Sequence, residues 1–154
     1  MAISVCEVSI TQSLVDLPVR ENNAAVGAIV DFWGVVRALE DGREIAGIEY
    51  EAHGPMAEHQ MRSLAETAIG KFGLTKVIIR HRIGFVPATE ASIVVRVESP
   101  RRSAAFSASQ WIMDELKRTV PIWKHPVFKG GNISPGGTAG EKSQRSLDSS
   151  SARA

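Results

Sequence analysis

The chain has 154 residues, of which 44% are hydrophobic and 23% are charged, and its formal net charge is +1. This length suits one domain with a buried core, and the composition is ordinary for a globular protein. No apolar run approaches the roughly 18 residues of a membrane span, and residues 1–10 lack the features of a secretion signal. Cys6 is the single cysteine, which excludes an internal disulfide. We therefore expect a cytoplasmic protein with one domain.

Charge is distributed unevenly along the chain. Residues 1–95 carry 8 Lys or Arg and 12 Asp or Glu, a balance of −4, whereas residues 96–129 carry 7 against 3, a balance of +4. The local excess favours an anionic ligand or partner terminus near the C-terminal third. It is too small and too confined for a nucleic-acid-binding surface, for which a broad basic stripe is expected.

The first part of the chain is predicted to form three strands. Apolar, β-branched and aromatic residues indicate strands at 3–10, 24–36 and 45–51. Between the second and third strands, Asp41-Gly42 is a dipeptide that favours a tight hairpin turn. These strands precede the first helical pattern.

Two helices and two further strands follow. Gly54-Pro55 opens a helix with one apolar face, and Gly73 is placed to end it. Strands are predicted at 76–82 and 92–98. A second helix then begins near a serine cap, and its buried stripe repeats at three- and four-residue spacing. The candidate caps are Ser99 and Ser103, and the stripe consists of Ala105, Ala108, Ile112 and Leu116.

The order of these elements predicts an α+β domain over residues 1–129, with a mixed or largely antiparallel sheet and two main helices packed on it. Pro121 must end the second helix, because its ring would collide with the carbonyl of Lys117. The residues after Pro121 are expected to form a proline-ordered loop. Residues 130–154 have no aromatic residue and are dominated by Gly and Ser, which predicts a disordered tail.

Several segments resemble the catalytic (large) subunit of molybdopterin synthase, the MoaE family. The resemblance covers about residues 24–125, and the segments occur in the family's order at its approximate spacing. It implies an α/β-hammerhead-like fold. The segments are FWGVVR (32–37), IEYEAHGPMAEHQM (48–61), HRIG (81–84), SPRRSAAFSASQWIMDELK (99–117) and PIWK (121–124).

The resemblance implies a sulfur transfer in which cyclic pyranopterin monophosphate becomes molybdopterin, with two sulfurs installed as a dithiolene. The sulfur arrives as a thiocarboxylate on the C-terminal Gly-Gly tail of a small ubiquitin-like carrier subunit. Two large subunits form a central dimer with one carrier at each end, a 2:2 heterotetramer. No cofactor, metal, nucleic acid or membrane is implied, and His53 and His59 lack the cysteine or acid spacing typical of zinc.

The reaction brings together a phosphate and a carboxylate-like anion, so fixed positive charge is required to offset their repulsion. The resemblance implies that Lys117 is the principal catalytic lysine, beside the carrier's terminal glycine. An ammonium there can pair with the thiocarboxylate and stabilise an oxyanion. Spacing alone would make Lys117 only a lysine placed favourably against the helix dipole. Lys124 is predicted to be a second catalytic lysine, folded back towards Lys117.

Three arginines are candidates for substrate binding. Arg101 and Arg102 open the second helix beside free backbone N–H groups and would form a phosphate cradle, unless they are simply solvated charges at a strand–helix junction. The resemblance places Arg37 in the pterin-phosphate site of its own or the neighbouring subunit. The chain departs from the family at Arg101, usually histidine, and at Pro126, usually glutamate; His125 is the polar residue that could substitute there.

These departures leave other hypotheses open. Without the usual glutamate, the chain could be a paralogue that docks the carrier but turns over poorly. A third hypothesis, an anion- or RNA-binding α+β domain, uses only the basic cluster. It is the weakest, because the chain lacks the interleaved aromatic residues and glycines of common RNA-recognition motifs.

Overall fold

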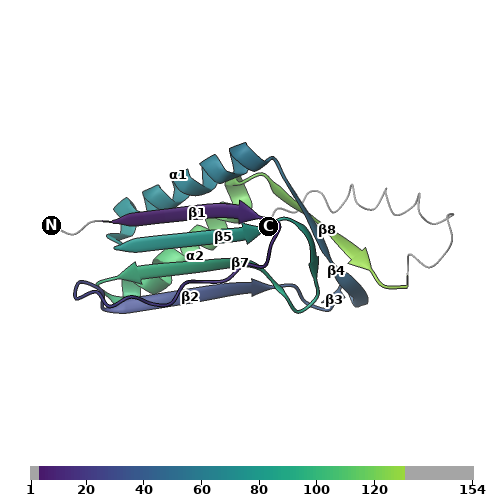
Figure 1. Cartoon of the computed structure of the whole chain (residues 1–154), viewed down its shortest axis with the longest axis horizontal. Helices are drawn as coiled ribbons and strands as arrows, with labels where there is room; N and C mark the ends of the chain where they lie inside the picture. Colours follow the sequence, from purple (N-terminus) through teal and green to yellow (C-terminus); the bar gives the residue numbers. More distant parts are fainter. Residues whose placement is uncertain (1–3, 131–154) are drawn as a thin grey trace.

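The structure, a computed structural model, describes residues 4–130, so the expected tail lies outside the described residues apart from Gly130. Two helices cover one face of a four-stranded main sheet, and a second, smaller sheet extends beyond one end of it (Figure 1). The elements in chain order are β1 (Val5–Thr11), β2 (Ala28–Val35), β3 (Leu39–Glu40), β4 (Arg43–Ala52), α1 (Gly54–Phe72), β5 (Lys76–Arg82), β6 (Gly84–Pro87), β7 (Ala91–Ser99), α2 (Arg102–Thr119) and β8 (Ile122–Phe128).

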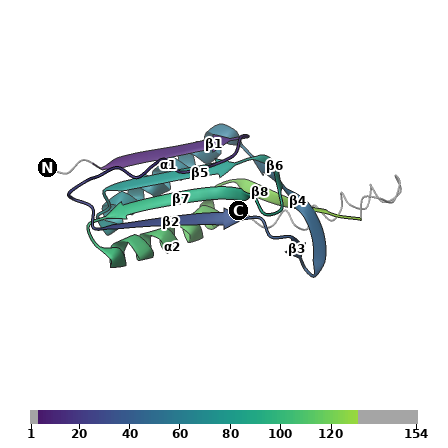
Figure 2. The same cartoon turned by 60° about the horizontal axis from the view of Figure 1, so that its bottom comes forward.

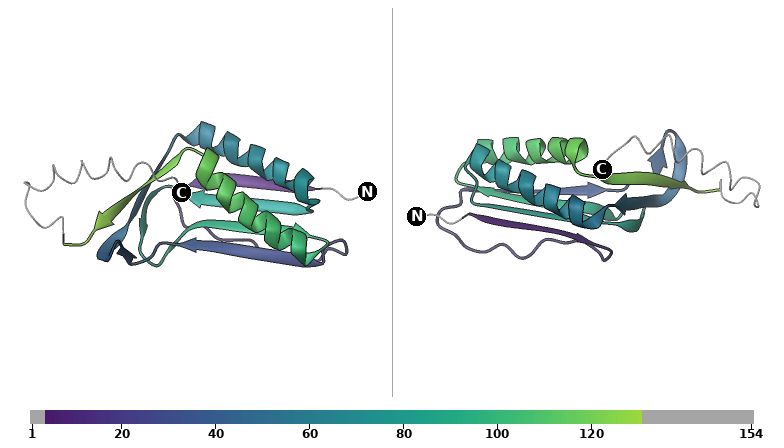
Figure 3. Two further views of the ribbon diagram at one scale, coloured as in Figure 1. Left: turned by 180° about the vertical axis from the view of Figure 1, so that it is seen from behind. Right: turned by 90° about the horizontal axis from the view of Figure 1, so that it is seen from above.

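The main sheet has the strand order β1-β5-β7-β2. β1 runs parallel to β5, whereas β7 is antiparallel to both of its neighbours, so the sheet is mixed. Figure 3 shows both helices on the same side of this sheet, with α2 crossing it obliquely. The predicted α+β class, with two helices packed on a mixed sheet, is confirmed.

The core lies between the main sheet and the helices. Alternate residues of β5 and β7 point toward the helix layer, where β5 packs against α1 and β7 against α2. The predicted stripe of α2 has no exposed surface. Full burial of each large apolar side chain contributes about 1.5–3 kcal/mol to folding. Within residues 4–130, neither helix is long and apolar enough to cross a membrane. The central contacts involve Val77, Ile79, Val95, Val97, Ile112 and Leu116.

The opposite face of the main sheet is covered by the segment between β1 and β2, which runs along it (Figure 2). Arg96 of β7 fixes this segment. Its guanidinium donates to both carboxylate oxygens of Asp31, at 2.8 and 2.9 Å, and to the carbonyl of Pro18 at 2.7 Å. Val15, within this segment, is buried. One of the seven basic residues in the C-terminal excess is therefore structural and does not face a ligand.

Two predicted turns are confirmed by their backbone angles. Asp41 and Gly42 have φ values of 51° and 74°, the left-handed conformation that a tight hairpin turn requires at both central positions. Gly73 ends α1 with φ at 70°, and its N–H donates to the carbonyl of Ile69 at 2.9 Å. Glycine is favoured at such an end because it has no Cβ to strain that conformation.

The start of α2 differs from the prediction of a serine cap. Arg101 occupies the cap position and makes no side-chain cap hydrogen bond. Ser99 is still paired with Ala28 at the end of β7, and its hydroxyl accepts a hydrogen bond from the Arg101 N–H at 3.1 Å. Ser103 already lies within the helix. Strand β7 thus includes Ser99, the residue that the sequence suggested as a helix cap, and α2 begins only two residues after Pro100.

The second sheet corrects the predicted loop after Pro121, which is the strand β8. β4 pairs with β6 through residues 47–50 and with β8 through residues 45–52, so β6 and β8 flank its two edges. Proline signals favour a loop, but an edge strand tolerates Pro126 because its missing N–H need not face the ladder. The short strands β3 and β6 were also not predicted.

Gly47 supports a prediction about the second sheet. An added Cβ would lie 2.3 Å from the carbonyl oxygen of Val86, whereas one at the exposed helical Gly70 would have no neighbour within 4 Å. We expect Gly47→Ala to lower the free energy of unfolding by about 1–3 kcal/mol through overpacking. Gly70→Ala should raise it by about 0.5–1 kcal/mol. Urea unfolding measures both, and equal changes in the two variants would contradict this description of β4.

Candidate functional site

The direction of α2 determines where its charged residues lie. The helix follows the end of β7 that meets the start of β2, where the Gly27 N–H donates to the Ser99 carbonyl at 2.9 Å. It then returns obliquely across the sheet, and its last turn lies beside the start of α1 (Figure 3). Arg102 and Lys117 are fifteen residues apart on this helix, an axial separation of roughly 22 Å. Within one chain, these two side chains lie too far apart to contact one phosphate group.

A groove of about 390 Å³ lies between α2 and β2. One wall is formed by side chains on the face of β2 that points toward the helices. The other wall is formed by residues of α2 that are spaced three or four apart. Phe106 is 62% exposed and Phe32 is 38% exposed, so both rings are open to a ligand. The groove is therefore apolar at its base and polar along the helix. Its lining residues are Val30, Phe32, Phe106, Ser109, Gln110, Met113, Asp114 and Lys117.

Lys117 is an exposed residue in the last turn of α2, at one end of the groove's helical wall. Asp114 lies one turn earlier on the same wall. Among the described residues, neither side chain makes an ion pair. Both charges can therefore meet a ligand without first breaking an internal pair.

Lys124 lies at the same end of α2 as Lys117, because β8 begins three residues after the helix ends. It is half-buried and directly opposite Tyr50 of β4, so the two side chains share one face of the β4–β8 pair. Pro126 shares this face, opposite Ile48. Lys124 is not among the residues that line the groove. The strand holds Lys124 in a fixed register where the sequence predicted a loop.

His125 lies on the other face of β8 from Lys124, because successive strand residues point to opposite sides. Its Nε2 is 3.2 Å from Oε1 of Glu51, which extends from the neighbouring strand β4. The predicted contact of His125 with substrate stays a prediction. No group of three or more His, Cys, Asp or Glu side chains that could hold a metal ion occurs in the part of the chain that is described.

Arg37 follows β2 at the end of the main sheet where α2 also terminates. Its side chain is 80% exposed and lies 3.8 Å from the carboxylate of Glu40. A surface ion pair of this kind contributes between zero and about 1 kcal/mol, so a phosphate could displace Glu40 at little cost. The structure thus places Arg37, Lys117 and Lys124 at one end of the main sheet.

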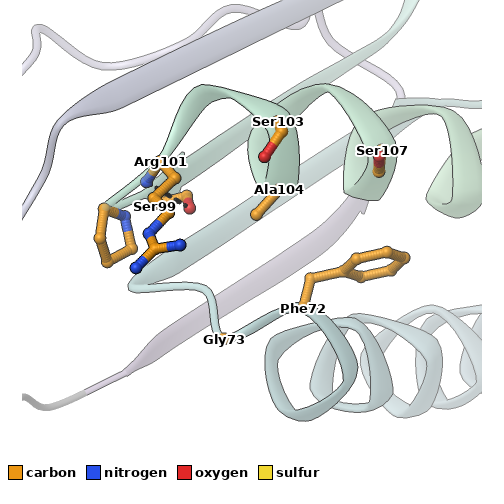
Figure 4. A pocket seen from close by; sticks show the side chains of 8 residues that line it. Phe72, Gly73, Ser99, Arg101, Ser103, Ala104 and Ser107 are labelled. Atoms are coloured by element: carbon orange, nitrogen blue, oxygen red, sulfur yellow. Dashed lines mark hydrogen bonds between the residues drawn. The ribbon is translucent and has the colours of Figure 1, made fainter.

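Arg101 and Arg102 lie at the opposite end, where a second hollow of about 420 Å³ separates the start of α2 from the end of α1. Figure 4 shows Arg101 at one side of this hollow and Phe72 of α1 at the other, with Ser103 and Ser107 on α2 above. Arg102 is exposed and does not line the hollow. The sequence predicted that these cations meet in one site, but Arg101 and Arg102 lie on a different surface of the chain from Lys117.

A buried pair of rings supports the strand that faces Lys124. His81 is 1% exposed, its Nδ1 lies 2.8 Å from the carbonyl of Arg82, and its ring meets that of Tyr50 edge-on at 5.3 Å between centroids. Burial lowers the pKa of His81 to about 4 and raises the pKa of the Tyr50 hydroxyl. Both rings are consequently uncharged at neutral pH.

Part of the groove was missed by the sequence analysis. Phe106, Gln110 and Asp114 lie on a side of α2 distinct from the buried stripe, and none was singled out as a candidate. Their spacing of four residues places them on one helical face and was the available signal. The spacing alone did not show which residues this helical face would meet, because only the folded chain places Phe32 of β2 opposite it.

The fold is an α+β domain with two helices on a mixed sheet, and Arg37, Lys117 and Lys124 lie at one end of it. A family model described as MoaE protein matches residues 6–119, and the chain belongs to this family. The resemblance predicted from the sequence is confirmed.

Relatives of known name are similar over most of the described chain. A molybdopterin synthase catalytic subunit from Thermoplasma volcanium is 42% identical over 119 residues, which cover 77% of this chain and 87% of that protein. The human protein of the same name is 38% identical, over 67% of this chain and 55% of its own length. Much of the human protein therefore has no counterpart in the matched region.

Solved structures give the same result. The crystal structure of molybdopterin synthase from Staphylococcus aureus has a TM-score of 0.67 and 33% identity, covering 71% of this chain and 80% of that one. A complex of subunits 1 and 2 of the molybdopterin-converting factor from Helicobacter pylori has a TM-score of 0.57, covering 76% and 81%. At 20% identity, the second likeness concerns the fold alone.

The lowered pKa of His81 predicts a pH dependence of stability. Because the folded-state pKa of about 4 lies below the ordinary histidine pKa of 6.5, the unfolded chain binds a proton more readily below pH 6.5. The contribution of uncharged His81 to the free energy of unfolding is fully present above pH 6.5, and it is lost as the pH falls toward 4. Between pH 7 and pH 5 we expect this group to remove about 2 kcal/mol from the free energy of unfolding.

Urea unfolding of the wild type and of His81→Gln at both pH values measures this effect. The variant should be less stable at pH 7, since it loses the buried ring contact, but it should show a correspondingly smaller loss on acidification. An identical loss in both proteins would show that other groups control this pH range.

Proposed function

We propose that this chain is the catalytic subunit of a molybdopterin synthase, acting as a sulfurtransferase in molybdenum cofactor biosynthesis. Its substrate is cyclic pyranopterin monophosphate, and its sulfur donor is the thiocarboxylate at the C-terminal Gly-Gly of a small ubiquitin-like carrier. The observation that carries the proposal is the position of Lys117 at the end of an open groove, in a chain of this family. A cytoplasmic location accompanies the proposal as a sequence prediction.

The chemistry assigned to Lys117 follows from charge. The thiocarboxylate sulfur attacks a substrate carbon that carries oxygen, and a C–S bond replaces a C–O bond as the oxygen leaves with a proton or as the freed phosphate ester. The product is a thioester between carrier and substrate. Water then adds to the acyl carbon, the acyl–sulfur bond breaks, and the carrier leaves as a carboxylate while sulfur stays on the substrate. The ammonium of Lys117 offsets the donor's negative charge and stabilises the oxyanion formed when water adds.

Lys124 is proposed as the second cation of this site. Its half-buried position opposite Tyr50 restricts its side chain, so its ammonium is presented from a strand. Arg37, at the same end of the main sheet, is proposed to bind the substrate phosphate in exchange for Glu40. A guanidinium suits this role because it can donate two parallel hydrogen bonds to phosphate oxygens.

Arg101 and Arg102 fit the same reaction only if a second copy supplies them. Their axial separation of about 22 Å from Lys117 excludes a shared phosphate within one chain. We infer a central dimer in which the start of α2 from one copy completes the basic end of the other. β2 is an edge strand of the described main sheet, and its exposed Trp33 and Val35 offer apolar surface that such an association would bury. One carrier at each end would give a 2:2 heterotetramer.

Pro126 favours a second candidate function, in which the chain binds the carrier but turns over poorly. Pro126 shares the face of Lys124, whereas Glu49 and Glu51 of β4 lie on the opposite face with His125. Glu51 therefore does not replace the missing acid beside Lys124.

A reaction of purified components separates these functions. The chain is mixed with thiocarboxylated carrier and cyclic pyranopterin monophosphate, and product is detected as the oxidised, fluorescent derivative of molybdopterin. Formation of product supports the synthase. Tight carrier binding with no product supports the second function, and neither result is expected of an unrelated anion-binding domain.

Lys117→Ala should reduce the turnover rate at least about a hundredfold, because an oxyanion-stabilising charge is lost. The carrier complex should survive, since Lys117 is exposed and makes no ion pair in the described residues. Lys71→Ala is the matched control, because Lys71 occupies the last turn of α1 and is not among the residues that line this groove. Near-normal turnover by Lys117→Ala would refute the catalytic assignment.

Mixing two inactive variants tests the shared site. If Arg102 of one copy serves the groove of the other, random dimers of Lys117→Ala and Arg102→Ala should regain about one quarter of wild-type activity, because half of the sites in half of the dimers are intact. The variants are mixed under conditions that exchange subunits, and product formation is measured. Failure of the mixture to exceed either variant alone would contradict a site shared between two copies.

A further inference from the structure

Asp114 is the single carboxylate among the residues that line the groove. It follows Gln110 by four residues and precedes Lys117 by three, so the three polar side chains lie along one wall. Phe106 continues this wall by one more turn, and Phe32 faces it from β2. The groove thus presents two open aromatic rings, an amide, a carboxylate and an ammonium in a defined order.

A carboxylate is unfavourable in a site for two anions unless it meets a hydrogen-bond donor of the ligand. Asp114 has no ion-pair partner among the described residues, and an ionised carboxylate can only accept hydrogen bonds. A thiocarboxylate or phosphate would be repelled by it. A 2-amino-4-oxopyrimidine ring, in contrast, presents a ring N–H and an adjacent amino group along one edge.

We propose that Asp114 is a specificity-determining residue that binds this donor edge of the pterin. The carboxylate accepts two parallel hydrogen bonds, one from the ring N–H and one from the 2-amino group. Phe32 and Phe106 pack against the faces of the ring system. This inference rests on the proposed function and deepens it by assigning the groove to the pterin.

The position of Lys117 agrees with this orientation. Asp114 and Lys117 are separated by three residues, a rise of about 4.5 Å along α2. A ring system held at Asp114 therefore extends along the helix toward the ammonium at which sulfur is transferred. The carrier's anionic tail is excluded from the Asp114 end and reaches Lys117 from the side of β8.

Binding of two small probes to the full chain tests the proposal without the carrier. Pterin has the 2-amino group, whereas lumazine has an oxygen there, which would face the carboxylate as a second acceptor. We expect the wild type to bind pterin at least about tenfold more tightly than lumazine, because a site built for a donor rejects an analogue that lacks it. Asp114→Asn should lose this preference, since an amide can donate to the lumazine oxygen.

Glu115→Gln is the matched control. It makes the same change of charge one residue away, but Glu115 pairs with Arg118 at 2.7 Å and does not line the groove. This variant should retain the preference for pterin. Circular dichroism of both variants checks that α2 is intact. A wild type that binds neither probe, or an Asp114→Asn variant that keeps the preference, overturns the proposal.

Steady-state kinetics separates this inference from the proposed function. Asp114→Asn should raise the KM for cyclic pyranopterin monophosphate at least about tenfold, with the affinity for the carrier unchanged, because only the ring loses its partner. If the wild type makes molybdopterin and Asp114→Asn has a normal KM, the ring site is wrong and the function stands. If the wild type makes no product but selects pterin through Asp114, the ring site stands and the function is wrong.

Discussion

The packing of α2 on the main sheet is the constraint on which the site depends. Its stripe of fully buried residues fixes which side of the helix faces the core, so the remaining sides can face only β2, α1 or solvent. The antiparallel return of α2 also fixes its direction. One end consequently lies beside the start of β2, and the other leads within three residues into β8 of the second sheet. Every charged residue on α2 has its location set by this one contact.

The basic excess of the C-terminal third separates into groups with different roles. Arg96 is held by Asp31 and by the segment over the outer face, and Arg118 is paired with Glu115. Both are satisfied within the chain. The remaining cations on α2 stand at its two ends, roughly 22 Å apart along the axis. An excess that looks continuous along the sequence is therefore divided in space, and this division is the reason for inferring a contribution from a second copy.

The strand β8 shows how register assigns roles to neighbouring residues. Lys124 and Pro126 share one face, whereas His125 faces Glu51 on the other. A loop would have allowed all three to approach the same ligand. Pairing with β4 removes that freedom, because a strand alternates its side chains. The missing acid of the family is thus not replaced by the nearest polar residues, and Asp114 is the carboxylate that the groove provides.

The sequence by itself determined the family, both helices with their buried stripes, the hairpin turn at Asp41-Gly42 and the helix end at Gly73. The family followed from the resemblance of several segments, whereas the helices and turns depend on periodicity and backbone preference within a few residues, which are local properties of the chain. Tertiary structure decided that the residues after Pro121 form a strand, that Arg96 is structural, and that Phe32 faces Phe106 across a groove. Such facts depend on pairing between residues distant in sequence, and neither spacing nor composition specifies which partner a strand or helix face will meet.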